Sequence, residues 1–135
     1  MSTDVRFILV DDDDFNNILH DIVIKSILGE GVDIETFTEP EKGLEFIQEK
    51  YAESSDHTVL FLDIHMPKIN GWEFLMRYEE FSDEVKIQIS IYVLSTSLDH
   101  RDRNKAADNK NVKGFVSKPI TTETILSIAR KEFSL

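Results

Sequence analysis

Short apolar runs that stop abruptly at polar residues constrain the fold of this chain more than any other feature. Residues 7–10 and 59–62 contain only valine, leucine, isoleucine and phenylalanine. A strand with one face in water alternates apolar and polar residues, whereas a strand of a parallel sheet is covered on both faces and can be apolar throughout. Both runs are therefore predicted to be buried strands.

Segments with helical periodicity separate the strand-like runs. Their apolar residues recur at intervals of three and four, and glycine or proline marks several of their ends. The predicted strands are residues 7–10, 32–37, 59–62, 89–94 and 114–117. The predicted helices are residues 18–27, 39–51, 74–81, 98–107 and a last helix from 122. This alternation requires βαβ crossovers, so we expect a doubly wound α/β fold with a parallel sheet, as a single domain over residues 1–135.

The composition limits the classes of partner. With 26 acidic and 15 basic residues among 135, the net charge is −11. A nucleic-acid-binding protein needs a basic surface that displaces counterions, and the sequence supplies none, so we expect no direct binding to nucleic acid. The chain also lacks cysteine, a signal-peptide pattern and a long uncharged apolar run. We expect a cytoplasmic protein that does not insert into membranes.

Polar side chains follow four of the five predicted strands. Asp11 and Asp12 come directly after the first strand, Asp63 after the third, Ser95 after the fourth and Lys118 after the fifth. Ligand sites of open parallel sheets lie beyond the carboxyl ends of the strands, so we expect these groups to converge at one edge. The next two acidic residues, 13 and 14, are expected instead to cap the following helix and to favour its dipole.

Three converging carboxylates need positive charge beside them. Two carboxylates ~4 Å apart repel by ~4 kcal/mol at an effective dielectric constant of about 20. Oxygen ligands of this kind suit Mg²⁺, whereas no cysteine is present and the four histidines show no ligand spacing. Asp63 would then be a carboxylate nucleophile that forms an aspartyl phosphate, and Lys118 would neutralise charge on the transferred group.

Taken together and in this order, the motifs resemble those of the response-regulator receiver domains of two-component phosphorelays, over essentially the whole chain. The residues that carry the resemblance are Asp11-Asp12-Asp13 after the first strand, Asp63 with Met66-Pro67 and Asn70-Gly71 after the third, Ser95-Thr96-Ser97 after the fourth, and Phe115 with Lys118-Pro119 at the fifth. The resemblance implies a flavodoxin-like (βα)5 fold with strand order 2-1-3-4-5.

The resemblance assigns a role to each residue of the acidic edge. Asp11 and Asp12 match the pair that holds Mg²⁺, and Asp63 matches the phosphoacceptor, which also contacts the metal. His65 matches the position whose backbone carbonyl completes the metal shell and whose side chain influences the lifetime of the phosphoryl group. Lys118 matches the lysine that binds the phosphoryl group.

Two further positions match the residues that switch the output surface. Ser95 matches the switch hydroxyl, although Thr96 follows immediately and leaves the register open by one residue. Phe115 matches the switch aromatic, where tyrosine is commoner, and Pro119 often follows a cis peptide in this family. Serine in place of the usual threonine keeps the hydroxyl donor but loses the methyl group that restricts its rotation.

The implied partners are a sensor histidine kinase or a histidine phosphotransfer protein as donor, and a downstream protein as target. Without an output domain, the receiver would act as a relay shuttle or as a diffusible effector, and phosphorylation can favour a homodimer. Three alternatives stay open: an aspartyl-phosphate phosphatase of the haloacid dehalogenase type, in which Phe15 breaks the motif; a receiver that binds partners without phosphorylation; and a receiver taken from a hybrid kinase.

Overall fold

A five-stranded parallel sheet forms the centre of the molecule. The structure is a computed structural model that describes residues 5–52, 57–66, 69–96 and 100–134. The strands are β1 (Arg6–Val10), β2 (Asp33–Phe37), β3 (Thr58–Asp63), β4 (Ile89–Ser95) and β5 (Val112–Ser117). Their order is β2-β1-β3-β4-β5, and all neighbours are parallel. The predicted doubly wound fold and strand order are confirmed.

Helices connect the strands. They are α1 (Asp14–Leu28), α2 (Pro40–Lys50), α3 (Gly71–Glu79), α4 (Asp83–Lys86), α5 (His100–Asp108) and α6 (Thr122–Phe133). The four-residue α4 was not predicted, because one turn capped by Ser82 is too short to show a periodic pattern. The predicted start of α5 at residue 98 lies outside the described residues. In the described part of the chain, no helix has both the length and the apolar character needed to cross a membrane.

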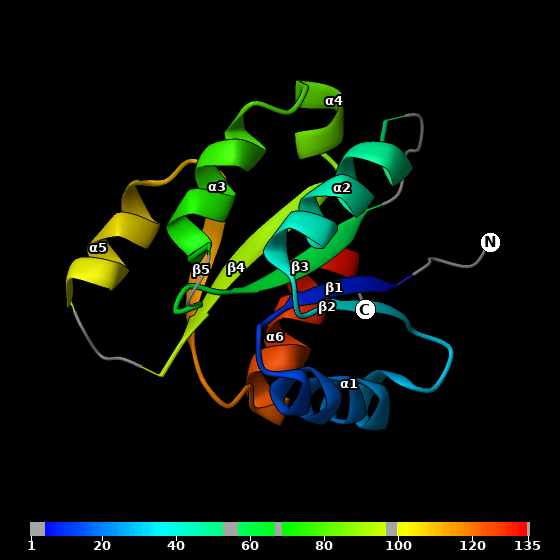
Figure 1. The fold of residues 1–135 in the computed structure, drawn as a ribbon. Coiled ribbons are helices and arrows are strands. Elements are labelled where there is room, and N and C mark those ends of the chain that lie inside the picture. Colours follow the sequence, from blue (N-terminus) through cyan, green and yellow to red (C-terminus); the bar gives the residue numbers. More distant parts are fainter. Residues whose placement is uncertain (1–4, 53–56, 67–68, 97–99, 135) are drawn as a thin grey trace.

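The helices cover both faces of the sheet (Figure 1). α1 and α6 lie on one face, and α2, α3, α4 and α5 lie on the other. Each face has its own apolar core, because alternate residues of a strand point to opposite sides. Every residue of β3 and β4 is buried, as the apolar run at residues 59–62 predicted for a strand inside a parallel sheet.

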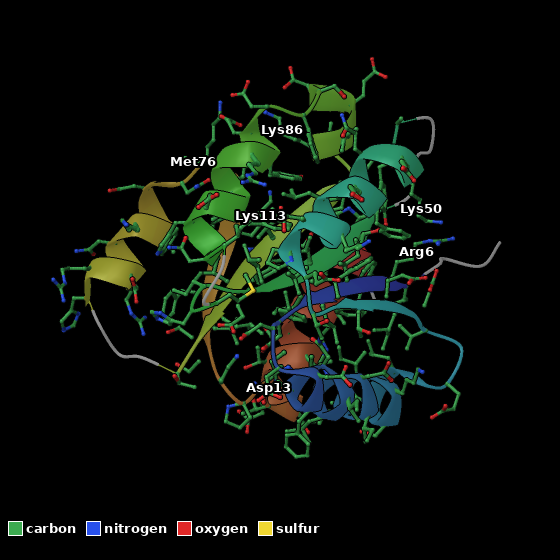
Figure 2. The ribbon with its side chains drawn as sticks, viewed as in Figure 1. Arg6, Asp13, Lys50, Met76, Lys86 and Lys113 are labelled. Carbon is green, nitrogen blue, oxygen red and sulfur yellow. The ribbon has the colours of Figure 1, made fainter. Side chains whose placement is uncertain are left out.

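α1 begins at the sheet edge where β1 ends. Asp13 is its N-cap, with its carboxylate accepting a hydrogen bond from the N–H of Phe15 at 3.0 Å, and Asp14 lies in the first turn. Figure 2 shows Asp13 at this end of the helix. The expected capping role of Asp13 and dipole role of Asp14 are confirmed.

The apolar residues of α1 do not all face the sheet. The buried face carries Asn17, His20 and Ile24, at helical spacing. Part of the expected apolar pattern, including Ile18 and Ile22, lies instead on the exposed side of the helix. A second apolar stripe therefore remains in solvent on α1.

The side chain of Glu132 in α6 is only 8% exposed and lies at the opposite end of the sheet from the acidic edge. Its carboxylate accepts hydrogen bonds from Ser90 Oγ at 2.7 Å, from Tyr92 Oη at 2.5 Å, and from the ring of His57 at 2.9 Å. Burial alone would raise the pKa of Glu132, but these donors outweigh it and hold the pKa below its ordinary value. The charged carboxylate therefore ties α6 to β4 and to His57, which precedes β3.

The absence of a side chain at Gly71 brings α3 close to the end of β3. A Cβ at this position would lie 2.6 Å from Ile64 Cα and 3.0 Å from the carbonyl oxygen of Asp63. We expect Gly71→Ala to lower the free energy of unfolding by about 1–3 kcal/mol, because backbone atoms must move to accept the methyl group. Gly31→Ala is the matched control, since nothing lies within 4 Å of its Cβ position. Urea denaturation compares the two, and equal stabilities would contradict the packing argument.

Glu132→Gln tests the buried carboxylate. Because the folded protein lowers the pKa of Glu132, the charge stabilises the fold above the ordinary pKa of 4.5, and this contribution is lost as the pH falls further. The variant should lose on the order of 2 kcal/mol at pH near 7, and the difference from the parent should shrink below pH 4.5. Glu45→Gln, at an exposed position of α2, is the control. A difference that grows in acid would contradict this account.

Candidate functional site

Two carboxylates and a lysine converge at the carboxyl edge of the sheet. Asp11 follows β1, Asp63 is the last residue of β3, and Lys118 follows β5. Lys118 Nζ lies 2.6 Å from Asp11 Oδ2 and 3.3 Å from Asp63 Oδ2. Asp11 and Asp63 are only 2% and 4% exposed, so water screens these charges weakly. The structure therefore brings together the groups that the strand-end pattern predicted.

Backbone hydrogen bonds position Asp11. Its N–H donates to the carbonyl of Phe37 at the end of β2, and its carboxylate accepts from the N–H of Asp13 at 2.9 Å. The buried side chain of Asn17 donates from Nδ2 to the carbonyls of Asp11 (3.0 Å) and Phe37 (3.3 Å). Asn17 thus joins α1 to the ends of β1 and β2, a role that the sequence did not reveal.

The ammonium group of Lys118 lies farther from Asp63 than from Asp11, so it offsets the negative charge of Asp63 less. Burial raises the pKa of Asp63 above its ordinary value, and nearby Asp11 adds to the rise. The N–H of His65, which donates to Asp63 Oδ1 at 3.1 Å, and the ammonium group of Lys118 act in the opposite direction. A buried carboxylate of this kind gains from additional positive charge.

Backbone and side-chain contacts hold Lys118 in place. Its backbone N–H donates to the carbonyl of Ser95 at the end of β4, and its peptide bond to Pro119 is cis, as the resemblance implied. Burial would lower the pKa of Lys118, but the two carboxylates outweigh that effect and raise it. The side chain is therefore a cation held at the centre of the site.

The acidic residues fit a small divalent cation. Asp11, Asp12 and Asp63 each offer one carboxylate oxygen, and these oxygens lie within 4.8 Å of one another. Asp12 is exposed, so the group is reachable from solvent. Among the described residues, three carboxylates stand against the ammonium of Lys118 and leave net negative charge. An all-oxygen donor set with access to water suits Mg²⁺.

The two expected switch residues flank the site. Ser95 is fully buried at the end of β4, whereas Thr96, the alternative hydroxyl, is exposed. Phe115 of β5 is partly buried, and the guanidinium carbon of Arg103 lies 5.0 Å from the centre of its ring. Ser95 thus lies on β4, which pairs with β3, the strand that ends at Asp63. Phe115 lies on β5, the next strand of the sheet, which α5 packs against.

The side chain of His65 reaches α5. His65 Nε2 lies 3.1 Å from Asp102 Oδ2, and the carboxylate side chain is largely buried. Sequence spacing gave no sign of this contact, because the two residues lie in different loop-helix segments. His20 is also close to the site: burial lowers its pKa, the charge of Lys118 adds to this effect, and Asp11 opposes it. His20 is therefore neutral near pH 7.

Solved structures of receiver proteins resemble this chain over nearly its whole length. A two-component response regulator from Cytophaga hutchinsonii is 30% identical, with a TM-score of 0.87, covering 99% of this chain and 100% of that one. A receiver protein from Dyadobacter fermentans is 23% identical, with a TM-score of 0.86 and coverages of 96% and 98%. A chemotaxis protein from Vibrio cholerae is 21% identical, with a TM-score of 0.69 and the same coverages.

The sequence comparisons agree with the site. No curated protein sequence matches the chain. The family pattern described as the response regulator receiver domain matches residues 7–130, which include every site residue described above. The chain belongs to the family of response regulator receiver domains.

Proposed function

We propose that this receiver accepts a phosphoryl group on Asp63 from a sensor histidine kinase or a histidine phosphotransfer protein, in a reaction that needs Mg²⁺. Receiver domains are phosphoacceptor switches that take phosphate from histidine kinases and bind Mg²⁺ at an acidic pocket. The observation that carries the proposal for this chain is the contact of Lys118 with both Asp11 and Asp63, beside the exposed carboxylate of Asp12.

The proposed chemistry is a displacement at phosphorus. A carboxylate oxygen of Asp63 forms the new bond, and the bond from phosphorus to the donor nitrogen breaks, with its electron pair staying on the donor. Lys118 stabilises negative charge on the phosphoryl oxygens. Asp11, Asp12, Asp63 and the backbone carbonyl of His65 would hold Mg²⁺, which supplies further positive charge when bound.

The switch would start at Ser95. A phosphoryl group on Asp63 adds about −1.5 to −2 charge, and its oxygens are strong acceptors for a hydroxyl donor on the neighbouring strand. An inward movement of Ser95 would leave space for Phe115, which lies one strand further along. Rotation of Phe115 would break its contact with Arg103 and change the surface made by β5 and α5.

The protein donor is proposed to dock on α1. Its four exposed apolar side chains follow helical spacing, so they form one ridge along the helix. They are Phe15 (69% exposed), Ile18 (52%), Leu19 (37%) and Ile22 (59%). The ridge begins two residues after Asp13, whose N–H bonds to the Asp11 carboxylate, so it starts at the mouth of the site.

This position suits a helical donor protein. A donor must bring its phosphorus to Asp63, and the surface next to the pocket must therefore be in contact during transfer. A ridge of apolar side chains packs into the groove of a helical surface, and burying it stabilises the encounter by removing apolar area from water.

Four expectations from the sequence stay predictions: the cytoplasmic location, action without an output domain, spontaneous loss of the phosphoryl group, and dimerisation on phosphorylation.

Incubation with acetyl phosphate tests the proposed chemistry. The parent chain should gain one phosphoryl group by intact mass in the presence of Mg²⁺ and none in excess EDTA. Asp63→Asn should gain none, because the amide is not a nucleophile. Asp14→Asn, which changes an exposed acid of the same loop-helix junction, should behave as the parent. Equal labelling of Asp63→Asn and the parent would refute Asp63 as the acceptor.

Ile18→Glu tests the docking surface. Transfer from a purified phosphohistidine phosphotransfer domain that labels the parent should slow about ten-fold or more, the effect of losing ~1.4 kcal/mol of binding. Labelling by acetyl phosphate should not change, because the small donor needs no docking surface. Ile87→Glu is the control: Ile87 is 83% exposed and precedes the start of β4, whereas the site lies at the end of that strand. Equal slowing of phosphoryl transfer in both variants, or no slowing in either, would argue against α1 as the docking surface.

A further inference from the structure

Helix α5 is attached to the rest of the protein mainly by charged side chains. Of its nine residues, all of which the structure describes, Ala106 alone is buried. The equally long α3 buries four residues, including Phe74, Leu75 and Tyr78. Apolar burial supplies most of the attachment energy of an ordinary surface helix, so α5 has an unusually weak apolar attachment. It lies at one side of the fold, next to α3 and β5 (Figure 1).

Three charged residues of α5 instead contact side chains of the loop after β3, of β5 and of α3. Asp102 pairs with His65 at 3.1 Å, Arg103 lies 5.0 Å from the ring centre of Phe115, and Lys105 Nζ lies 5.2 Å from that of Trp72. Contacts between a cation and an aromatic ring contribute about 0.5–1 kcal/mol at exposed sites. No large apolar interface is therefore available to replace the Asp102–His65 pair if it breaks.

The Asp102–His65 pair spans the loops that flank the phosphoacceptor. The N–H of His65 donates to Asp63 Oδ1, so its imidazole starts directly beside that carboxylate. Asp102 belongs to the helix that follows β4, and β4 is the neighbour of β3 with Leu94 opposite Asp63. The pair thus bridges from the β3 side to the β4 side of the site mouth.

We propose that Asp102 is a positioning residue, which holds the His65 side chain across this side of the mouth and thereby slows hydrolysis of the aspartyl phosphate. In that hydrolysis a water oxygen bonds to phosphorus, the bond to the Asp63 oxygen breaks with its electron pair on the carboxylate, and a proton is released. Release of His65 opens a path for water. The inference rests on the proposed phosphorylation of Asp63.

The arrangement links the lifetime of the phosphoryl group to the state of α5. A target protein that binds α5 and takes Asp102 away from His65 would shorten that lifetime, whereas one that holds α5 in place would prolong it. The same residue would then serve both the chemistry at Asp63 and the surface read by a partner.

The test measures the decay of phosphorylated protein. The parent, Asp102→Ala and Asp108→Ala are labelled with acetyl phosphate and Mg²⁺, the donor is removed, and the phosphorylated fraction is followed by intact mass. Asp102→Ala should decay three-fold to ten-fold faster than the parent (~0.7–1.4 kcal/mol in the barrier). Asp108→Ala, at an exposed position of the same helix, should decay as the parent does. Should Asp102→Ala melt early, Asp102→Asn keeps the size of the side chain and serves in its place.

A double-mutant cycle separates positioning from a general effect on helix docking. If Asp102 acts through His65, then Asp102→Ala should not accelerate decay further in a His65→Ala background. Additive effects, an unchanged decay in Asp102→Ala, or equal acceleration in Asp108→Ala would each overturn the inference. These outcomes differ from failure of the proposed function, in which the parent itself would gain no phosphoryl group.

Discussion

The contact of one lysine with two buried carboxylates is the constraint on which the rest of this structure depends. Lys118 joins the ends of β1 and β3 from the end of β5, so the loops after three strands meet around one cation. Removing charges from water is costly, and each of the two carboxylates is tolerable because the ammonium group lies beside it. The cluster still carries more negative than positive charge once Asp12 is included. A site in this condition favours the binding of a divalent cation.

Charged side chains also dominate the contacts of α5, in which Ala106 is the one buried residue. Asp102, Arg103 and Lys105 contact His65, Phe115 and Trp72, and His65 in turn donates its N–H to the Asp63 carboxylate. A change of charge at Asp63 acts on groups that hold this helix by electrostatic contacts, and these are the interactions most sensitive to such a change. The α1 ridge lies on the other face of the sheet, so the proposed donor and the proposed target would contact different sides of the molecule (Figure 1).

The sheet and the acidic edge could be predicted because both follow from local patterns. An apolar run identifies a buried strand, and parallel strands bring their carboxyl ends to one edge, which places Asp63 near Lys118 without any knowledge of loops. Contacts between distant segments could not be predicted in this way. From the sequence pattern, Glu132 would be assigned to the exposed side of its helix. Its hydrogen-bond partners lie on β4, 40 and 42 residues away in the sequence. The single turn of α4 and the pairing of Asp102 likewise depend on tertiary contacts that leave no periodic signal.

A crystal structure of the chain with Mg²⁺ and beryllofluoride, which mimics a phosphoryl group, tests the central claim most directly. The account predicts the beryllium atom bonded to the Asp63 carboxylate, with Lys118 in contact with a fluorine atom and Mg²⁺ beside Asp11 and Asp12. An adduct on another residue, or none at a concentration that saturates other receivers, would contradict it.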